Sequence, residues 1–393
     1  MTIAKIQVDI EESCKVHPLF SSGSPVPRTV EIEMSPRRLF GFASLALQDP
    51  DIEGRRTAAE AEHLWHSLNE IYGPLLDFTD NNLTGKSEPE GMKRVSELVG
   101  VGCGLFALCE QVGLQLNRIS RFIIKGGTKR ADFEFYSNGN RFFHETKGTT
   151  RKSISGERKY IRAQKDGTIA YCAANGPKVT ASSGSIALYR PKSRTDFDSK
   201  VTFIDPPVGD QRGAREVREE DELVCALNYY KNIYTLAYRR TPDRRLVNVD
   251  TWVSEIIRRI RSGSEPPTSP PENLFARPRL SQRHRDAVYG GTILDSRTTI
   301  ESAAKYRDFG EASRNEKAPV RFVGVAEEVT SLIRSCDWEG LLAYSHVVEQ
   351  SAASHVDTDV LNSGVIIRDI EGDEEIEALS RSIFNALRKR FAR

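Results

Sequence analysis

Hydrophobic and polar residues alternate along residues 131–148, and the alternation is interrupted once, by Asn-Gly at positions 138–139. Alternation with a period of two is typical of strands, and Asn-Gly between two such runs is a strong signal for a β-hairpin. A two-residue loop there places Asp132 on the first strand directly opposite Glu145 on the second. Lys147 then projects from the same face as Glu145, one pleat further along. The pattern predicts a hairpin with two acids and a lysine on one face.

The two opposed carboxylates carry the candidate chemistry. Side chains opposed across a strand pair lie about 5 Å apart, so Asp132 and Glu145 would repel each other and weaken the hairpin. A divalent cation between them would remove that cost, and a metal held by carboxylates beside a lysine is suited to phosphodiester hydrolysis. A solvated polar face is the alternative interpretation. A second Glu-x-Lys at 157–159 lies in a helical pattern with no aspartate shortly before it, so it lacks this geometry.

Longer-range periodicity places the hairpin within a mixed order of helices and strands. An apolar helical pattern covers residues 92–112, and a basic helical pattern extends from Gly156 to about residue 165. Three further runs are typical of strands: residues 116–124, 185–189 and 201–204. Alternating helices and strands are typical of the α/β class. For residues 90–210 we therefore predict the order αβββαβ.

Asp132, followed on the next strand by Glu145-Thr146-Lys147, resembles the pattern of the PD-(D/E)xK nuclease superfamily, which has the restriction-endonuclease-like fold. The chain departs from that pattern at Ala131, where the family has a proline, but that proline is not a ligand. The resemblance implies an α/β fold with a restriction-endonuclease-like αβββαβ core. It also implies that Asp132 and Glu145 bind Mg²⁺ together with the backbone carbonyl of Thr146 and water molecules.

The resemblance covers residues 90–205 and implies roles for further side chains. Lys147 would orient the attacking water and offset charge on the phosphate, and its pKa is expected to fall beside a bound metal. In this family the helix before the hairpin often supplies a further glutamate, for which Glu97, early in the helix, fits better than Glu110 near its end. A favourable charge at the positive end of the helix dipole is the alternative interpretation of Glu97. Gln164 on the following helix would contact the site or a backbone phosphate.

Basic residues are concentrated around the predicted hairpin. Residues 118–165 contain thirteen Lys or Arg and four Asp or Glu, a local net charge of +9 in a chain whose formal net charge is +1. Such patches hold phosphate backbones, although a solvated basic surface is the common alternative. We expect these residues to contact nucleic acid, with Gln164 beside them: Lys129, Arg130, Arg151, Lys152, Arg158, Lys159 and Arg162.

The rest of the chain is divided by its patterns into further regions. A mixed N-terminal segment covers residues 1–85, with a strand at 29–34 and helices at 36–48 and 55–72, and an exposed loop or linker follows at 80–90. After the core we expect a helical extension at 215–262, a Pro-rich linker at 263–281 and a mainly helical C-terminal domain at 282–393. The helices of that last domain are expected near 325–336, 338–352 and 373–392. A length of 393 residues suits two or three such units.

Composition excludes several classes of protein and site. The six cysteines form no CxxC pair, which argues against zinc fingers and redox dithiols. The N-terminal residues contain no apolar signal segment, and the longest apolar run, residues 98–109, is too short to span a bilayer. We therefore expect a soluble, cytoplasmic protein that does not associate with membranes.

Together these patterns predict a metal-dependent phosphodiesterase, and more specifically a DNA endonuclease that uses Mg²⁺, with Mn²⁺ able to substitute. A role in restriction or defence against foreign DNA follows by analogy alone. Cutting both strands would favour a homodimer. Two other functions stay open: a nucleic-acid-binding module with an inactive nuclease core, and an adaptor protein that acts through its helical C-terminal region.

Overall fold

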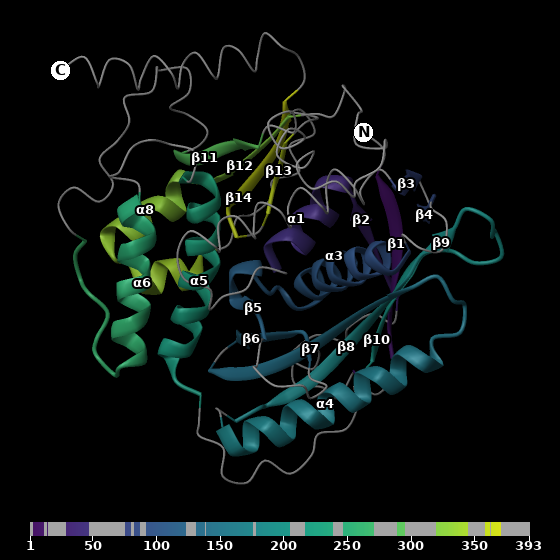
Figure 1. Ribbon diagram of the computed structural model, residues 1–393, viewed down its shortest axis with the longest axis horizontal. Helices are drawn as coiled ribbons and strands as arrows, with labels where there is room; N and C mark the ends of the chain where they lie inside the picture. Colours follow the sequence, from purple (N-terminus) through teal and green to yellow (C-terminus); the bar gives the residue numbers. More distant parts are fainter. Residues whose placement is uncertain are drawn as a thin grey trace, which may run out of the picture. The chain divides into compact units, whose positions relative to one another are not determined.

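The computed structural model describes part of the chain, and only that part is discussed below (Figure 1). The described residues are 3–11, 14, 29–46, 75–79, 82–86, 92–122, 131–137, 139–175, 178–204, 217–238, 247–270, 289–294, 320–344, 358–361 and 363–370. Two of the predicted helices, at 55–72 and 373–392, lie outside these residues, and so do Lys129 and Arg130. Within them the protein is of the α/β class.

A seven-stranded mixed sheet forms the centre of residues 1–229. The strands lie in the order β2 (Thr29–Met34), β1 (Ala4–Ile10), β10 (Lys200–Ile204), β8 (Ala181–Leu188), β7 (Asn140–Thr149), β6 (Phe133–Ser137) and β5 (Ile119–Arg121). Two neighbouring pairs are parallel, β7 with β8 and β1 with β10, and the others are antiparallel. All eight residues of β8 are buried, as expected for a strand covered on both faces.

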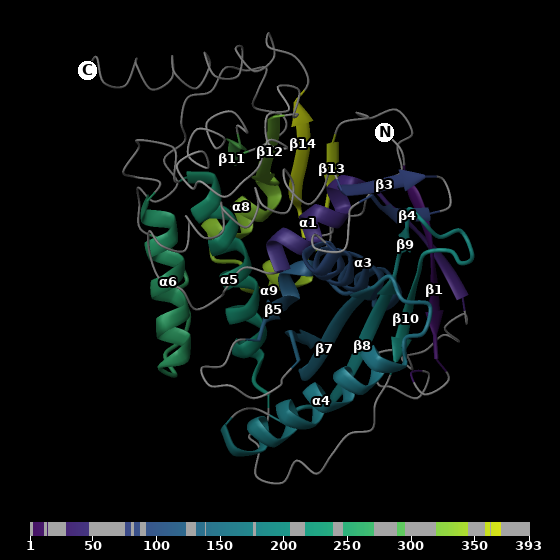
Figure 2. The ribbon, with the colours of Figure 1, turned by 45° about the vertical axis from the view of Figure 1, so that its right-hand side comes forward.

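Helices cover the two faces of this sheet. α1 (Pro36–Ala46) and α3 (Met92–Val112) lie on one face, and α4 (Ser155–Asn175) lies along the other (Figures 1 and 2). Glycines allow α3 to approach β7 closely, because a Cβ at Gly100 would lie 2.5 Å from the backbone nitrogen of Gly148. On the opposite face Ile161 of α4 packs over Gly184 of β8. The strand carrying the predicted site is therefore held between two helices.

α3 corresponds to the helix predicted at 92–112, and the structure shows why it is so apolar. Its segment Lys93–Val112 is long and apolar enough to cross a membrane, judged by length and composition alone. No other helix in the described part of the chain meets this test. In the protein, however, 72% of that segment is buried. Leu98, Leu105 and Leu108 are fully covered. Burial of that kind is typical of a core helix packed between a sheet and a neighbouring helix.

The structure joins regions that the sequence patterns separated. β1 and β2, from the predicted N-terminal segment, belong to the same sheet as the predicted core. The predicted loop at 80–90 contains β4 (Asn82–Gly85), which forms a small sheet with β3 (Leu76–Thr79) and β9 (Arg190–Pro191). The strand expected at 116–124 begins as a turn of 3₁₀ helix, Leu116–Arg118, and β5 is short. α4 is longer than its basic pattern because an apolar stretch with Ile169 and Cys172 continues its buried face.

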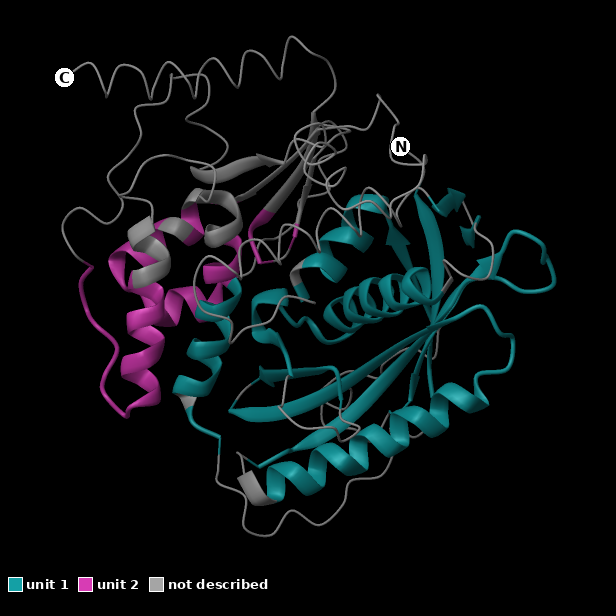
Figure 3. Ribbon diagram, in the orientation of Figure 1, with its two compact units in different colours: residues 1–229 teal, residues 230–393 magenta. Residues whose placement is uncertain are grey.

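The chain divides into two compact units, residues 1–229 and residues 230–393 (Figure 3). The long helix α5 (Glu219–Tyr238) crosses the boundary, and α6 (Val247–Arg261) follows it. Residues 262–270 of the predicted Pro-rich linker form no helix or strand, and the Trp338 ring nitrogen donates to the carbonyl of Pro267 at 3.1 Å.

The expectation of a mainly helical region at 282–393 is wrong for the described residues. These contain a four-stranded antiparallel sheet in the order β11 (Tyr289–Leu294), β12 (Val320–Val325), β14 (Val365–Ile370) and β13 (Thr358–Val360). Two of the predicted helices are present as α8 (Glu327–Ser335) and the short α9 (Trp338–Ala343). β12 and β14 are rich in Val and Ile, a strand signal that was available in the sequence.

Candidate functional site

The hairpin of β6 and β7 has the register that the Asn-Gly loop predicts. Phe133 pairs with His144 and Phe135 with Phe142, and Gly139 has the positive φ of +70° that a tight hairpin turn requires. Asp132 lies just before β6, beyond the last paired residues. Its backbone N–H donates to Glu145 Oε2 at 2.8 Å, so the two acids are adjacent.

Asp132, Glu145, Thr146 and Lys147 meet at this end of the hairpin. The Glu145 side chain is 2% exposed, and its Oε1 forms an ion pair with Lys147 Nζ. The same Nζ lies 4.0 Å from Asp132 Oδ2, and the Thr146 hydroxyl donates a long hydrogen bond of 3.5 Å to that oxygen. Asp132 and Lys147 are both partly exposed. The cluster therefore has one buried acid, with an acid and a lysine that solvent can reach.

The charges of this cluster shift one another's protonation. Burial raises the pKa of Glu145 well above its ordinary value, and the neighbouring Asp132 carboxylate raises it further, while Lys147 acts in the opposite direction. Burial by itself would lower the pKa of Lys147, but attraction to Glu145 and Asp132 outweighs it and the pKa is raised. These directions describe the protein groups alone. The expected fall in the pKa of Lys147 concerns a site with bound metal and stays a prediction.

Glu97 lies near this cluster but has its own partner. Its Oε2 accepts from Arg94 Nη1 at 2.8 Å on the surface of α3, and its charge is among those that raise the pKa of Lys147. Burial raises the pKa of Glu110, near the other end of the helix, and the charge of Arg38 offsets only part of that rise. Of the two glutamates considered for the site, Glu97 is thus the one with an electrostatic effect on Lys147.

The residues present fit a small, hard cation with few protein ligands. Glu145 Oε1 is buried and, among the described residues, accepts no hydrogen bond of normal geometry, so its ion pair with Lys147 compensates its burial. Asp132 adds a second carboxylate. In the described residues no three His, Cys, Asp or Glu side chains are close enough to hold one ion, so Glu97 does not complete such a set. Mg²⁺, which keeps several waters and commonly binds through one or two carboxylates, suits this donor set.

The basic residues predicted to contact nucleic acid differ in their surroundings. Arg151, Lys159 and Arg162 are exposed. Lys152 is also exposed and forms an ion pair of 3.4 Å with Asp196, whereas Arg158 is paired with Glu11. These five residues lie on α4 and on the segment between β7 and α4, while Lys129 and Arg130 lie outside the described residues. Exposed cations at the start of one helix can reach a phosphate backbone without losing buried partners.

Two buried polar groups beside the cluster were not assigned a role from sequence. His144 is fully buried on the face opposite Glu145, and its two ring nitrogens each lie 2.9 Å from a hydroxyl, of Ser183 and of Ser185. Both nitrogens therefore have structural partners within the core. Thr168 of α4 is also fully buried, and its hydroxyl accepts from the backbone N–H of Ala131 at 2.7 Å. No sequence motif marks Thr168. Its one available signal was its position one helical turn after Gln164.

The amide oxygen of Gln164 is buried and accepts no hydrogen bond from the residues that the structure describes, although the residue as a whole is partly exposed. The structure places Gln164 on the same helix as the exposed cations Lys159 and Arg162. A direct contact between Gln164 and the acids of the hairpin is not among the hydrogen bonds of the described residues.

No family model, curated protein or solved structure matches this chain. Function is therefore inferred from the geometry of the cluster formed by Asp132, Glu145, Thr146 and Lys147.

Proposed function

We propose that this protein is a metal-dependent nuclease of the PD-(D/E)xK type, and specifically a DNA endonuclease. The observation that carries the proposal is the meeting of two carboxylates and one lysine, Asp132, Glu145 and Lys147, at the end of one hairpin. The order α3, β5, β6, β7, α4, β8 around that hairpin supports it, because it follows the αβββαβ order of the restriction-endonuclease-like core.

In this proposal Asp132 and Glu145 hold Mg²⁺, with the backbone carbonyl of Thr146 as a third protein ligand. Bound metal would lower the pKa of a water molecule and offset charge on the phosphate. Asp132 would contribute its partly exposed carboxylate, whereas the buried Glu145 is held in place by the Asp132 N–H and by Lys147. That fixed geometry is what a site for in-line attack requires, since misplacement by even 1 Å is costly.

Lys147 has two roles in the proposed reaction. Its ammonium lies between the two acids, and the side chain is partly exposed. It can therefore donate a hydrogen bond to a water molecule on the solvent side and orient the lone pair of that water toward phosphorus. As negative charge builds on the phosphate, the same ammonium stabilises it. The exposed cations of α4 and of the segment before it, such as Arg151 and Lys159, would hold the phosphate backbone on either side.

The test is cleavage of circular and linear DNA with Mg²⁺, with Mn²⁺ and with chelator. Asp132→Ala and Lys147→Ala should each lower the rate of cutting by roughly 10²–10³-fold, because each removes a group that acts in the transition state. Glu157→Ala is the matched control: it removes the glutamate of the second Glu-x-Lys, on α4, and should leave metal-dependent cutting near the wild-type rate.

Other outcomes would replace the proposal. A wild type that shifts DNA on a gel without cutting it would be a binding module with an inactive core. A wild type that neither cuts nor binds DNA or RNA would direct attention to an adaptor role for the C-terminal region. Double-strand cutting by the wild type would favour a homodimer, and cutting of unmodified foreign DNA would support the role in restriction or defence.

A further inference from the structure

The hydroxyl of Thr168 is fixed in orientation by two backbone groups. It donates to the carbonyl of Gln164, one turn earlier on α4, at 2.8 Å. This bond occupies its only proton, so its lone pairs are available to accept, and it accepts the Ala131 N–H at 2.7 Å. Because the side chain is fully buried, water cannot take over either bond. Thr168 thus ties α4 to the residue that precedes Asp132.

The backbone around Asp132 is held at three points. The Ala131 N–H is held by Thr168, the Asp132 N–H is held by Glu145 Oε2, and the Asp132 carbonyl accepts from the Phe122 N–H at 2.8 Å. The bond from Phe122 belongs to the sheet, and the bond to Glu145 involves a member of the site itself. The bond to Thr168 is the one that comes from a helix on the face of the sheet.

Strand pairing alone does not fix Asp132. The ladder between β6 and β7 begins at Phe133, so Asp132 lies at its open end, next to residues 123–130, which lie outside the described part of the chain. Ala131 is buried among Phe143, Cys172 and Val179, which anchors its side chain but leaves the peptide orientation to its hydrogen bonds. The Ala131 N–H belongs to the peptide that enters Ala131, so its bond to Thr168 fixes the φ angle of Ala131, through which the chain reaches Asp132.

We propose that Thr168 is a positioning residue that sets the Asp132 carboxylate at its place beside Glu145 and thereby determines the affinity of the pair for a divalent cation. The inference rests on the proposed function, because it concerns the same two acids. Without the hydroxyl, the buried Ala131 N–H has no acceptor, and the peptide turns to find one. Such a turn changes the φ angle of Ala131 and thereby shifts the backbone of Asp132 relative to Glu145, while the core of the sheet stays in place.

The experiment is a calorimetric titration of the full chain with Mn²⁺ and, separately, Mg²⁺. Thr168→Val keeps the shape of the side chain and removes the hydroxyl, and it should weaken Mn²⁺ binding about tenfold, as the loss of a group that orients a ligand does. Thr168→Ser keeps the hydroxyl and should bind Mn²⁺ with wild-type affinity. Thr202→Val is the matched control, since Thr202 is a buried threonine of β10 in the same sheet, and it should also keep wild-type affinity.

The outcomes separate this inference from the proposed function. Absence of Mn²⁺ binding in the wild type would overturn both. Wild-type binding that persists unchanged in Thr168→Val would overturn the positioning role and leave the nuclease proposal intact. Equal losses in Thr168→Val and Thr202→Val would show a general packing effect and also overturn it.

A second measurement covers the case in which Thr168→Val does not fold. Thr168→Ala, which adds no bulk, then replaces it in the titration with the same expected tenfold loss. If neither folds, amide hydrogen exchange in the wild type decides. Mg²⁺ should slow exchange at Ala131, because the cation and the Thr168 bond favour the same peptide orientation. Unchanged exchange at saturating Mg²⁺ would overturn the inference.

Discussion

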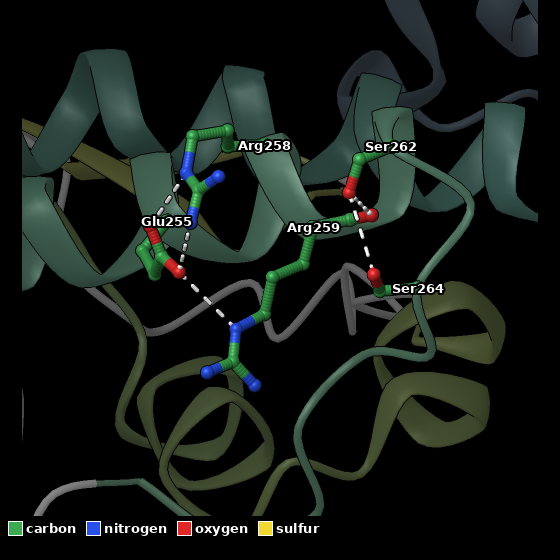
Figure 4. Close-up of polar contacts among 5 residues, drawn as sticks. All are labelled: Glu255, Arg258, Arg259, Ser262 and Ser264. Carbon is green, nitrogen blue, oxygen red and sulfur yellow. Dashed lines mark hydrogen bonds and ion pairs between the residues drawn. The ribbon is translucent and has the colours of Figure 1, made fainter.

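Two glutamates of this protein, Glu145 and Glu255, each pair with basic side chains, yet their pKa values shift in opposite directions. Glu145 is buried beside Asp132 and Lys147, and its pKa is raised. Glu255 on α6 is partly exposed and accepts hydrogen bonds from Arg258 at 2.7 and 2.8 Å and from Arg259 at 3.2 Å, and its pKa is lowered to about 2 (Figure 4). The cations are similar, so the difference comes from the surroundings.

The difference shows what each arrangement can do. At Glu255 solvent reaches the charges, so the hydrogen bonds from the two arginines are the largest influence on its pKa and favour the ionised form. Such an exposed pair has little effect on stability. At Glu145 loss of water opposes the charge and a second acid repels it, so one lysine only partly compensates. A carboxylate so placed would be stabilised by an additional cation. Of these two clusters, the buried one is therefore the one for which we propose a divalent metal.

The largest expected effect comes from the packing that buries the cluster. Gly148→Ala would place a Cβ on the carbonyl oxygen of Ser96 in α3, and neither backbone can move without disturbing the sheet. We expect a loss of about 3 kcal/mol or more in the free energy of unfolding, measured by urea denaturation. The matched change is Gly156→Ala on α4, where a Cβ meets open space and should raise stability by about 0.5 kcal/mol. Equal changes in the free energy of unfolding for the two variants would show that close packing of α3 against β7 does not limit the side chain at position 148.

An intermediate effect is expected from removing the lysine. Lys147→Met leaves the buried Glu145 beside Asp132 without its cation and should cost about 2 kcal/mol, less than for a fully buried pair because Lys147 is partly exposed. Arg258→Met removes a cation from Glu255, which keeps Arg259 and water, and should leave the melting temperature unchanged. Thermal unfolding at low ionic strength compares the two. A melting temperature that falls equally in both variants would remove the distinction between the clusters.

The smallest expected effect is in the acid titration of Glu255. Its folded-state pKa of about 2 lies below the ordinary value of 4.5, so its contribution to stability is present above pH 4.5 and is lost as the pH falls toward 2. In Glu255→Gln this loss should be missing from the acid side of a stability profile. Carboxyl carbon NMR checks the contrast directly, because Glu145 should titrate above its ordinary value and Glu255 below it. Coincident midpoints would contradict the comparison.

Local patterns were enough to predict the hairpin and the proximity of two acids and a lysine at its end. The Asn-Gly loop fixes the register, and register fixes which side chains are opposed, so the neighbourhood of Asp132, Glu145 and Lys147 followed from spacing alone. The apolar run at 92–112 was long enough to define α3 to its ends. Both are properties of one continuous segment, in which neighbouring residues determine the outcome.

Contacts between distant segments could not be predicted in this way. The pairing of β1 with β10 and the bond between Thr168 and Ala131 depend on how separate elements pack, and no local pattern encodes them. The four-stranded sheet of residues 289–370 was missed for a different reason, since its strands are short and lie between helical patterns that suggested a helical region. There the Val- and Ile-rich runs at 320–325 and 365–370 were the stronger signal.

The parallel pair of β1 and β10 also sets a delay during synthesis. β1 comprises residues 4–10, and its neighbour in the sheet comprises residues 200–204. At typical ribosomal rates the second strand emerges roughly 10 to 40 s after the first. For that interval one edge of β1 can pair with β2, while the edge that later pairs with β10 is open to a chaperone or another nascent chain. Translation speed between the codons for β1 and those for β10 is therefore expected to influence how much of this protein reaches its native state.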